Sequence, residues 1–173
     1  MTKPEGEQYH PRLTGWWGDD KSSRFKMTNQ FVPRRGAAGW QLSNPSMLDS
    51  VSLMASLKVF EEAGGMEKLG ERSRRLTGYL EELLDELKGE EGVRGLFEII
   101  TPRRKEERGA QLSVRLGEGL LDGVLEYLDE KGVVVDERKP DVIRVAPAPL
   151  FNSFGDVWDF VRVFGEALRR TKM

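Results

Sequence analysis

The amino-acid sequence predicts an α/β fold in which helices cover one face of a mainly antiparallel sheet. Three observations support this fold class. After Gly89, the apolar positions follow strand and helix periods in the order β-β-α-β-β-α. Before it, an amphipathic stripe from about Met66 to Lys88 predicts one long helix. From Met1 to about Pro45 no period is sustained, and the abundance of Gly, Pro, Arg and aromatic residues is typical of a functional loop or of an arm that lies on another surface.

Two helices are expected ahead of Gly89, where a left-handed cap would end the second one. Residues 46–63 are predicted to form the first helix, because apolar side chains recur there at helical spacing, and a Gly-Gly pair follows. The apolar positions of this first helix are Leu53, Leu57 and Phe60. The stripe of the second helix is predicted to consist of Leu69, Ser73, Leu76, Leu80, Leu83 and Leu87.

Four short strands are expected after the second helix. Residues 97–100 form the first, and residues 111–116 alternate between polar and apolar side chains, which predicts a half-buried strand. Val133–Val135 and residues 142–145 are expected to form two further strands, joined by a polar turn.

Two more helices accompany these strands. The first has an apolar stripe across residues 120–128 and is closed by Gly132. The second is expected to begin with Asn152 or Ser153 as its N-cap. Its buried face is predicted to contain Phe154, Val157, Trp158, Val161, Phe164 and Leu168.

The composition excludes several classes of function. The 173 residues carry 27 basic and 29 acidic side chains, a formal net charge of −2, which argues against a protein that coats nucleic acid or an anionic membrane surface. No apolar run approaches the roughly 20 residues needed to cross a bilayer. Cysteine is absent and His10 is the only histidine, so thiolate nucleophiles, Ser/His/Asp triads and a metal site are not expected. The N-terminus lacks a signal-peptide pattern, so a cytoplasmic location is expected.

The string Gly15-Trp16-Trp17-Gly18 is the first candidate site. An indole N–H donates a hydrogen bond and the ring accepts none, so a phosphate oxygen would be a suitable partner. The flanking glycines would let the backbone and the rings approach a ligand closely. The same string could anchor the loop on a core or on a partner, and the residues alone favour that structural interpretation.

Asn44 and Arg144 are further candidates. Asn44 precedes a proline, which pushes it into an extended or turn conformation, where its amide could face a ligand or simply serve the turn. In the strand predicted over residues 142–145, alternation directs Ile143 and Val145 one way and Arg144 the other. A guanidinium can bind a carboxylate through two hydrogen bonds, but an exposed Arg on a strand is most often only solvated.

Five strings occur together in one order: GWWGDDKSSRFKM (15–27), GAAGWQLSNPS (36–46), LTGYLEELL (76–84), ITP followed by EERGAQLSV (100–114), and IRVAPAPLFNSFGDVWDFV (143–161). Together they resemble segments of kynureninase, the pyridoxal-phosphate (PLP)-dependent hydrolase of tryptophan catabolism. The resemblance extends from about Pro11 to Leu168.

The resemblance implies the C-terminal part of a fold-type-I PLP-dependent enzyme. Residues 1–65 would then be the end of the large domain with an interface arm, residues 66–89 the connecting helix, and residues 90–173 the small α+β domain. The implied reaction is the hydrolysis of kynurenine or 3-hydroxykynurenine to alanine and anthranilate or 3-hydroxyanthranilate. This step belongs to the kynurenine pathway and to NAD biosynthesis, and the enzyme would be a homodimer.

The resemblance also implies roles for single residues. Trp16 would donate its indole N–H to the PLP phosphate and Asn44 would line the cofactor pocket, both reaching into the site of a neighbouring subunit. Arg144 would bind the α-carboxylate of the substrate, and Trp17 and Asp19 would face the substrate. Kynureninases usually have His where this chain has Asp19, and an acidic group there lacks the imidazole donor and would be unfavourable near a substrate carboxylate or the cofactor phosphate.

In kynureninases, the lysine that forms the Schiff base with PLP lies upstream of the tryptophan string, and none of the lysines here lies in that motif. We therefore expect no catalytic residue within these 173 residues and no activity from the chain alone. It would act in a homodimer or together with a chain that carries the N-terminal half. The alternative hypothesis is a non-catalytic module that pairs with an intact kynureninase subunit. Either way, the chain by itself would expose apolar surface that the large domain covers.

Overall fold

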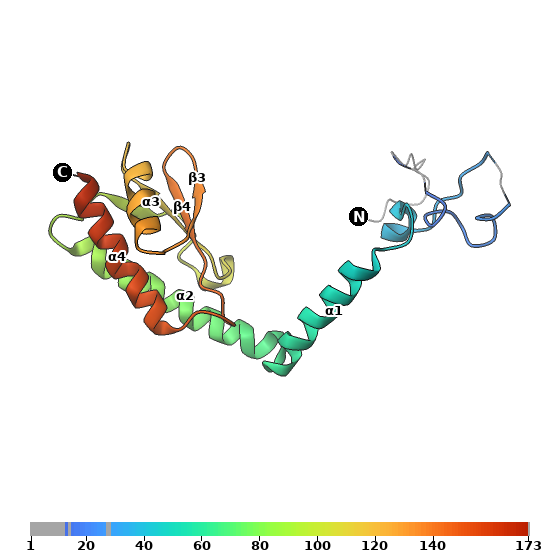
Figure 1. Ribbon diagram of the computed structural model, residues 1–173, viewed down its shortest axis with the longest axis horizontal. Coiled ribbons are helices and arrows are strands. Elements are labelled where there is room, and N and C mark those ends of the chain that lie inside the picture. Colours follow the sequence, from blue (N-terminus) through green and yellow to red (C-terminus); the bar gives the residue numbers. More distant parts are fainter. Residues whose placement is uncertain (1–12, 14, 27–28, 173) are drawn as a thin grey trace. The chain divides into compact units, whose positions relative to one another are not determined.

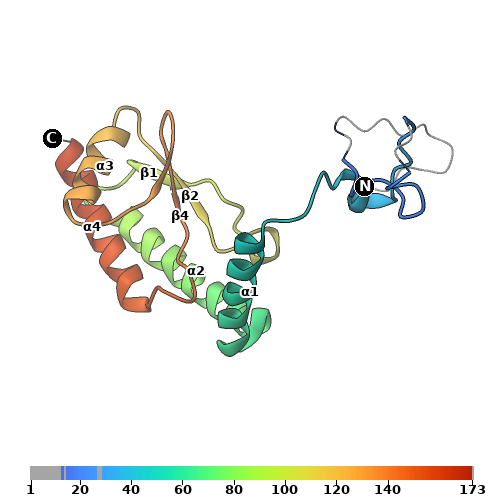
Figure 2. The same ribbon diagram turned by 45° about the vertical axis from the view of Figure 1, so that its right-hand side comes forward.

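The computed structural model describes residue 13, residues 15–26 and residues 29–172. The chain divides into two compact units, Met1–Leu57 and Lys58–Met173. The boundary between them falls within helix α1 (Met47–Glu62), which Figure 1 and Figure 2 show from two sides. The three-part domain division predicted from the sequence, with boundaries after residues 65 and 89, remains a prediction.

The first unit contains little regular structure. Besides the first part of α1, its described elements are the 3-10 helix η1 (Gly36–Trp40) and an isolated antiparallel bridge between Asp19 and Pro33. The helix predicted over residues 46–63 is confirmed, yet none of its residues is buried. Its large exposed apolar side chains are Met47, Leu48, Val51, Leu53, Met54, Leu57 and Val59.

The second unit holds the remaining elements of the described chain. The helices are α2 (Gly65–Gly89), α3 (Leu121–Glu130) and α4 (Phe154–Lys172), with the 3-10 helix η2 (Lys105–Glu107). The strands are β1 (Phe97–Ile99), β2 (Leu112–Leu116), β3 (Asp136–Arg138) and β4 (Val142–Val145). After α2, strands and α-helices follow in the order β1-β2-α3-β3-β4-α4, which confirms the predicted order.

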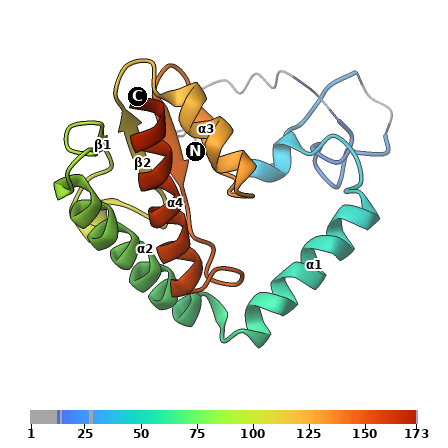
Figure 3. The ribbon, with the colours of Figure 1, turned by 60° about the vertical axis from the view of Figure 1, so that its left-hand side comes forward.

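The four strands form one sheet in the order β1-β2-β4-β3, and every neighbouring pair is antiparallel. In the register of β2 with β4, Val114 lies opposite Ile143 and Ser113 lies opposite Arg144. Because side chains alternate across a strand, Val114 and Ile143 share one face and Ser113 and Arg144 share the other. The helices cover the apolar face, with α4 between α2 and α3 (Figure 3). The predicted antiparallel sheet with helices on one face is therefore confirmed.

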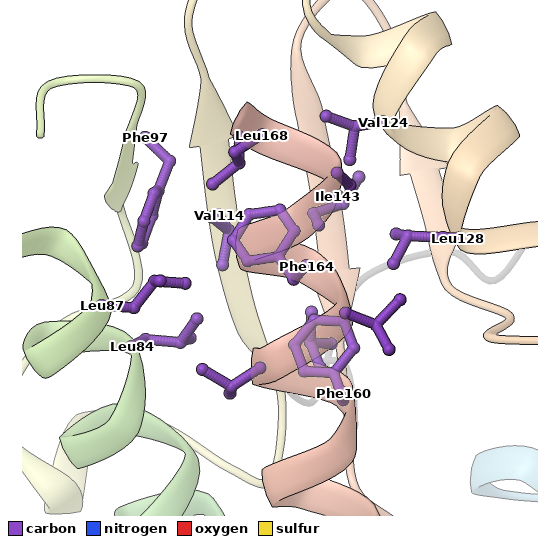
Figure 4. Packing of buried hydrophobic residues seen from close by; sticks show 14 of the residues in the cluster. Leu84, Leu87, Phe97, Val114, Val124, Leu128, Ile143, Phe160, Phe164 and Leu168 are labelled. Carbon is purple, nitrogen blue, oxygen red and sulfur yellow. The ribbon is translucent and has the colours of Figure 1, made fainter. Parts of the chain in front are cut away.

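Phe164 of α4 lies at the centre of the hydrophobic core and is fully buried. Its ring packs edge-to-face on Phe97 at a centroid distance of 5.3 Å and stacks on Phe160 at 5.7 Å. Side chains from the neighbouring helices surround it, namely Leu84 and Leu87 of α2 and Val124 and Leu128 of α3 (Figure 4). Burying each side chain of this size contributes roughly 1.5–3 kcal/mol, so this cluster dominates the stability of the second unit.

The third strand does not lie where the sequence predicted it. β3 is Asp136–Arg138, immediately after the valine run 133–135 that was expected to form the strand. Asp136 pairs with Arg144 and Arg138 with Val142, so residues 139–141 make the connection. Because a tight turn sets the register of a hairpin, the polar residues beside the turn are paired and the valines precede the strand.

The predicted buried face of α4 was wrong at one position. Trp158 is 51% exposed, whereas Phe160, which was not predicted to be buried, is 8% exposed. Each residue turns the helix by about 100°, so a stripe that includes Val157, Phe160, Val161 and Phe164 leaves Trp158 on the solvent side. The buried face of α2 also differs from the prediction at one position. Leu84, which was not predicted to be buried, is buried, whereas the predicted Leu83 is only partly buried.

Ser153 caps α4, as one of the two predicted alternatives. The Asp156 N–H donates to Ser153 Oγ at 3.2 Å, and Asp156 Oδ2 accepts from the Ser153 N–H at 2.7 Å and from its hydroxyl at 2.9 Å. These backbone and side-chain hydrogen bonds hold the pKa of Asp156 below its ordinary value. The other alternative, Asn152, accepts from the Ala148 N–H at 2.8 Å and so fixes the turn before the helix.

Candidate functional site

Trp16 and Trp17 of the first unit lie in a tight turn. The Gly18 N–H donates to Gly15 O at 2.9 Å. A Cβ on Gly15 would lie 2.3 Å from the backbone of Leu42, and one on Gly18 would lie 2.7 Å from Gly39 O. Only glycine permits such close approaches. The glycines are thus required by the packing of the turn on residues 39–42 of the same unit, a reason that the sequence did not reveal.

Trp16 and Trp17 have different surroundings. Trp16 is 52% exposed and meets Trp17 and Phe25 edge-to-face, with ring centroids 6.2 and 5.5 Å apart. The Nε1 of Trp17 is buried and has no hydrogen-bond partner within the described part of the chain. Since an indole N–H can only donate, the turn contains one buried donor without an acceptor among the described residues.

Arg24 holds this turn from the side and was not a candidate in the sequence. Its guanidinium carbon lies 4.4 Å from the centre of the Trp17 ring, a cation–π contact. Its Nη2 donates to the carbonyl oxygens of Trp17 and Asp19 at 3.2 and 3.3 Å. No local pattern signals this role, because an arginine seven positions after an indole is common on solvated surfaces.

Asp19 is only 8% exposed and closes the loop on itself. Its Oδ1 accepts from the backbone N–H groups of Asp20 and Val32 at 2.9 and 2.8 Å and from the Ser23 hydroxyl at 3.2 Å. Val32 is thirteen residues away, so one carboxylate oxygen joins the two limbs of the loop beside the bridge to Pro33. The Asp19 carboxylate therefore stabilises the loop through these hydrogen bonds.

Asn44 lies in the segment between η1 and α1, and its side chain is exposed. Like Trp16, Trp17 and Asp19, it belongs to the first unit. Arg144, the fifth sequence candidate, belongs to the second unit. The structure thus brings Trp16, Trp17 and Asp19 together in one turn and keeps Arg144 as a separate element of the candidate site.

Arg144 lies on the open face of the sheet, as the alternation of β4 predicted. Ile143 and Val145 are buried in the core, whereas the side chain of Arg144 is 33% exposed. Its Nη2 forms an ion pair with Asp136, the residue directly opposite on β3. Its Nε is buried without a hydrogen-bond partner among the described residues.

A cavity of about 340 Å³ lies beside Arg144. Its apolar wall includes Val133, Val135, Val145, Pro147, Val157 and Phe160. Asn152, Asp156 and Asp159 contribute polar atoms to the lining. The lining is thus mixed, and a cavity with one incompletely paired guanidinium can take a small molecule that carries a carboxylate.

Within the ranges that the structure describes, no group of three or more His, Asp or Glu side chains could hold a metal ion. His10 lies outside those residues. Nor is any helix in the described ranges both long and apolar enough to cross a membrane. Basic side chains near η2 are engaged by acidic ones, since Arg103 contacts Asp85 at 2.8 Å and Arg104 contacts Glu107 at 3.1 Å.

The family model described as the Kynureninase C-terminal domain matches residues 69–164. Kynureninase 2 of Neurospora crassa is 58% identical over 170 residues, and Kynureninase 1 of Phaeosphaeria nodorum is 60% identical over 166 residues. These matches cover 98% and 96% of this chain but 35% and 32% of the two relatives. The chain therefore spans about a third of the length of the curated relatives it matches.

Solved structures share the fold at much lower identity. The apo structure of a cysteine desulfurase from Thermococcus onnurineus has a TM-score of 0.69 at 17% identity, covering 92% of this chain and 40% of that chain. A variant of C-DES with glycine covalently linked to its PLP cofactor has a TM-score of 0.68 at 13% identity, covering 90% of this chain and 38% of that chain. This likeness concerns the fold alone, and it confirms the predicted fold class, the C-terminal part of a fold-type-I enzyme.

The family assignment rests on sequence, because one fold can support many activities. The family model extends from α2 into α4 and so includes all four strands of the sheet. The sequence match to Kynureninase 2 of Neurospora crassa covers 98% of this chain and therefore includes residues of both units. This chain belongs to the kynureninase family and contains its C-terminal domain.

Proposed function

We propose that this chain forms the C-terminal part of a kynureninase that hydrolyses kynurenine or 3-hydroxykynurenine to alanine and anthranilate or 3-hydroxyanthranilate. The observation that carries the proposal is Arg144, which lines a cavity and has an Nε unpaired within the described ranges, in a chain 58% identical to a curated kynureninase. The reaction would serve tryptophan catabolism and NAD biosynthesis in the cytoplasm. Residues 1–65, 66–89 and 90–173 would be the end of the large domain, the connecting helix and the small domain.

The residues of the first unit fit PLP, a cofactor that carries a phosphate. The buried Nε1 of Trp17 lacks an acceptor in the described part of the chain and Trp16 is half exposed, and both observations support a phosphate partner for this turn. Trp16 would donate to the phosphate, and Asn44 would line the same pocket from its exposed segment, both across a homodimer interface. When bound, PLP supplies an electron sink for cleavage of the Cβ–Cγ bond.

Arg144 would bind the α-carboxylate of the substrate. Its ion pair with Asp136 involves only Nη2, and Nε has no partner among the described residues. A guanidinium that still has free donors can bind a carboxylate through two hydrogen bonds and so fix its orientation. The cavity beside it would hold the adjoining part of the substrate.

Trp17 and Asp19 would face the substrate from the tryptophan turn. The Oδ1 of Asp19 is engaged within the loop, so its Oδ2 is the oxygen left for a substrate donor. A carboxylate there accepts hydrogen bonds where the usual histidine of the family would donate one. We therefore propose that Asp19 selects for a donor group on the substrate.

The experiment is complementation. This chain is joined to the segment of Neurospora crassa Kynureninase 2 that precedes the matched region, and hydrolysis of kynurenine in the presence of PLP is followed by anthranilate fluorescence. We expect activity, and we expect Arg144→Ala to raise KM about tenfold or more with a smaller loss in kcat. Arg115→Ala, which removes an arginine from the same sheet face, is the control and should leave KM within about twofold.

Two results would contradict the proposal. One is an unchanged KM in Arg144→Ala, which would remove this residue from the carboxylate site. The other is a lack of hydrolysis under conditions in which the Neurospora crassa enzyme, rebuilt from the same two segments, is active.

The second candidate function is a non-catalytic module that pairs with an intact kynureninase subunit. The exposed apolar side chains of α1 favour it, because such surface is normally covered by other polypeptide. This chain is mixed with intact Neurospora crassa Kynureninase 2 and the mixture is analysed by size-exclusion chromatography with light scattering. Mixed dimers with a changed rate would support the module, and an unchanged elution profile would rule it out.

A further inference from the structure

The hairpin of β3 and β4 brings one acidic side chain to Arg144. Asp136 is its direct cross-strand partner, and in the described part of the chain it is the one carboxylate that pairs with this guanidinium. On the opposite side of β4, the register partner of Arg144 is Ser113, which carries no charge. On the open face of the sheet, Asp136 is thus the charged register partner of Arg144.

Asp136 is shared between two arginines. Its Oδ2 contacts Arg144, and its Oδ1 accepts from Arg138 Nη1 at 2.7 Å. Two cations and one anion leave this group with a net charge of +1. Arg144 is therefore paired with a carboxylate that it shares with Arg138, so Asp136 does not neutralise both guanidinium groups.

The pairing does not occupy the whole guanidinium. Asp136 contacts Nη2, whereas Nε is buried and unpaired and the side chain borders the cavity of about 340 Å³. A buried N–H without an acceptor is costly, so it marks a place for an acceptor from a ligand. Asp136 engages Nη2 and leaves Nε without an acceptor among the described residues, so the ion pair does not use all the donors of the guanidinium.

We propose that Asp136 is a positioning residue that holds the Arg144 guanidinium in place for the carboxylate of the substrate, an inference that rests on the proposed function. An arginine side chain has several rotatable bonds and loses this freedom when it binds a ligand. A guanidinium already fixed by Asp136 has lost that freedom beforehand, so the carboxylate binds more tightly.

The first test needs no ligand and uses the full 173-residue chain. The Nε–Hε signal of Arg144 is assigned in a ¹⁵N–¹H spectrum by its loss in Arg144→Lys. In Asp136→Asn we expect its exchange with water to rise about fivefold or more, because the guanidinium loses its ion pair. Asp136→Glu should restore part of the protection. Glu137→Gln is the matched control, since it removes the neighbouring charge of β3, and it should leave the signal unchanged.

The second test adds a carboxylate probe, L-alanine, at up to about 100 mM. We expect a saturable shift of the Arg144 signal and a dissociation constant about five- to tenfold weaker in Asp136→Asn, with Glu137→Gln within about twofold of wild type. Unchanged amide spectra of β3 and β4 show that the substitution leaves the fold intact.

The outcomes separate this inference from the proposed function. Tighter binding of L-alanine in Asp136→Asn would make Asp136 a competitor and overturn the inference. Equal exchange of the Arg144 signal in Asp136→Asn and wild type would overturn it as well. If L-alanine leaves the wild-type signal unchanged, the carboxylate role in the proposed function fails, and the exchange measurement still decides whether Asp136 holds Arg144.

Discussion

The two units of this chain differ in the burial of their apolar side chains. In the second unit, Phe164 is fully buried, and buried side chains from α2, α3 and α4 surround it. In the first unit, α1 has no buried residue, and large apolar side chains such as Trp16 and Phe25 are at least half exposed. Its loop is closed instead by the hydrogen bonds of Asp19 and Arg24. We infer that the second unit has its own source of stability, whereas the first presents surface for other polypeptide.

The largest expected effect comes from the core of the second unit. Phe164→Ala should lower the free energy of unfolding by about 3–5 kcal/mol, because it removes a fully buried ring that contacts two other aromatic rings. Trp158→Ala is the control on the exposed side of the same helix and should cost less than about 1 kcal/mol. Denaturant unfolding followed by circular dichroism measures both. Equal losses of unfolding free energy in the two variants would mean that Phe164 does not lie on the buried side of α4 and Trp158 on its exposed side.

The next effect concerns the loop of the first unit. Asp19→Ala removes the acceptor of two partly buried backbone N–H groups and one hydroxyl, and it should weaken the loop by about 1–3 kcal/mol. Faster hydrogen exchange at the Val32 amide, with unchanged exchange in β2 and β4, is the expected result. Asp20→Ala removes a neighbouring exposed carboxylate that, among the described residues, accepts hydrogen bonds from Ser22 alone, and it should leave the Val32 amide protected. Global loss of protection after Asp19→Ala would show that the two units are not independent in stability.

A smaller effect depends on pH at the start of α4. Hydrogen bonds from Ser153 lower the pKa of Asp156 below its ordinary value of 3.8. The stabilisation from its ionised form is therefore fully present above about pH 4 and is lost as the pH falls through the lowered pKa. Asp156→Asn should lower the midpoint of thermal unfolding at pH 7. The difference in midpoint between this variant and wild type should become smaller below pH 4. A constant difference from pH 7 to pH 3 would exclude the charged cap.

The smallest effect on stability is expected for α1. Replacing Leu48 and Met54 by Lys should change the free energy of unfolding by less than about 0.5 kcal/mol, because both side chains are already exposed. The same pair should reduce self-association in sedimentation velocity, since it interrupts an exposed apolar surface. A loss of stability comparable to that of Phe164→Ala would instead mean that α1 is part of a core.

Elements with strong periodicity were predictable from the sequence. The stripe through Leu76, Leu80 and Leu87 of α2 and the alternation of β2 are both confirmed, because burial selects apolar residues at the period of each element. The same alternation correctly directed Arg144 away from the core. Periodicity does not decide between neighbouring aromatic residues, so Trp158 and Phe160 were distinguished only by what α4 packs against.

Residues that act through distant partners escaped prediction. Asp136 pairs with Arg144 because residues 139–141 set the hairpin register, and the valine run before it gives the stronger strand signal. Asp19 and Arg24 close the tryptophan loop through contacts five to thirteen residues away, which no turn pattern encodes. The part of the candidate site that depends on register and loop closure therefore required the structure.

The position of α4 in the chain has a consequence for biosynthesis. This helix supplies Phe160, Phe164 and Leu168 to the core, yet it is translated after every strand that it covers. Until α4 leaves the ribosome, the inner faces of the sheet and of α2 remain without their main cover. Nascent chains halted before Phe154 would therefore expose an apolar sheet, and such intermediates are the species that chaperones bind.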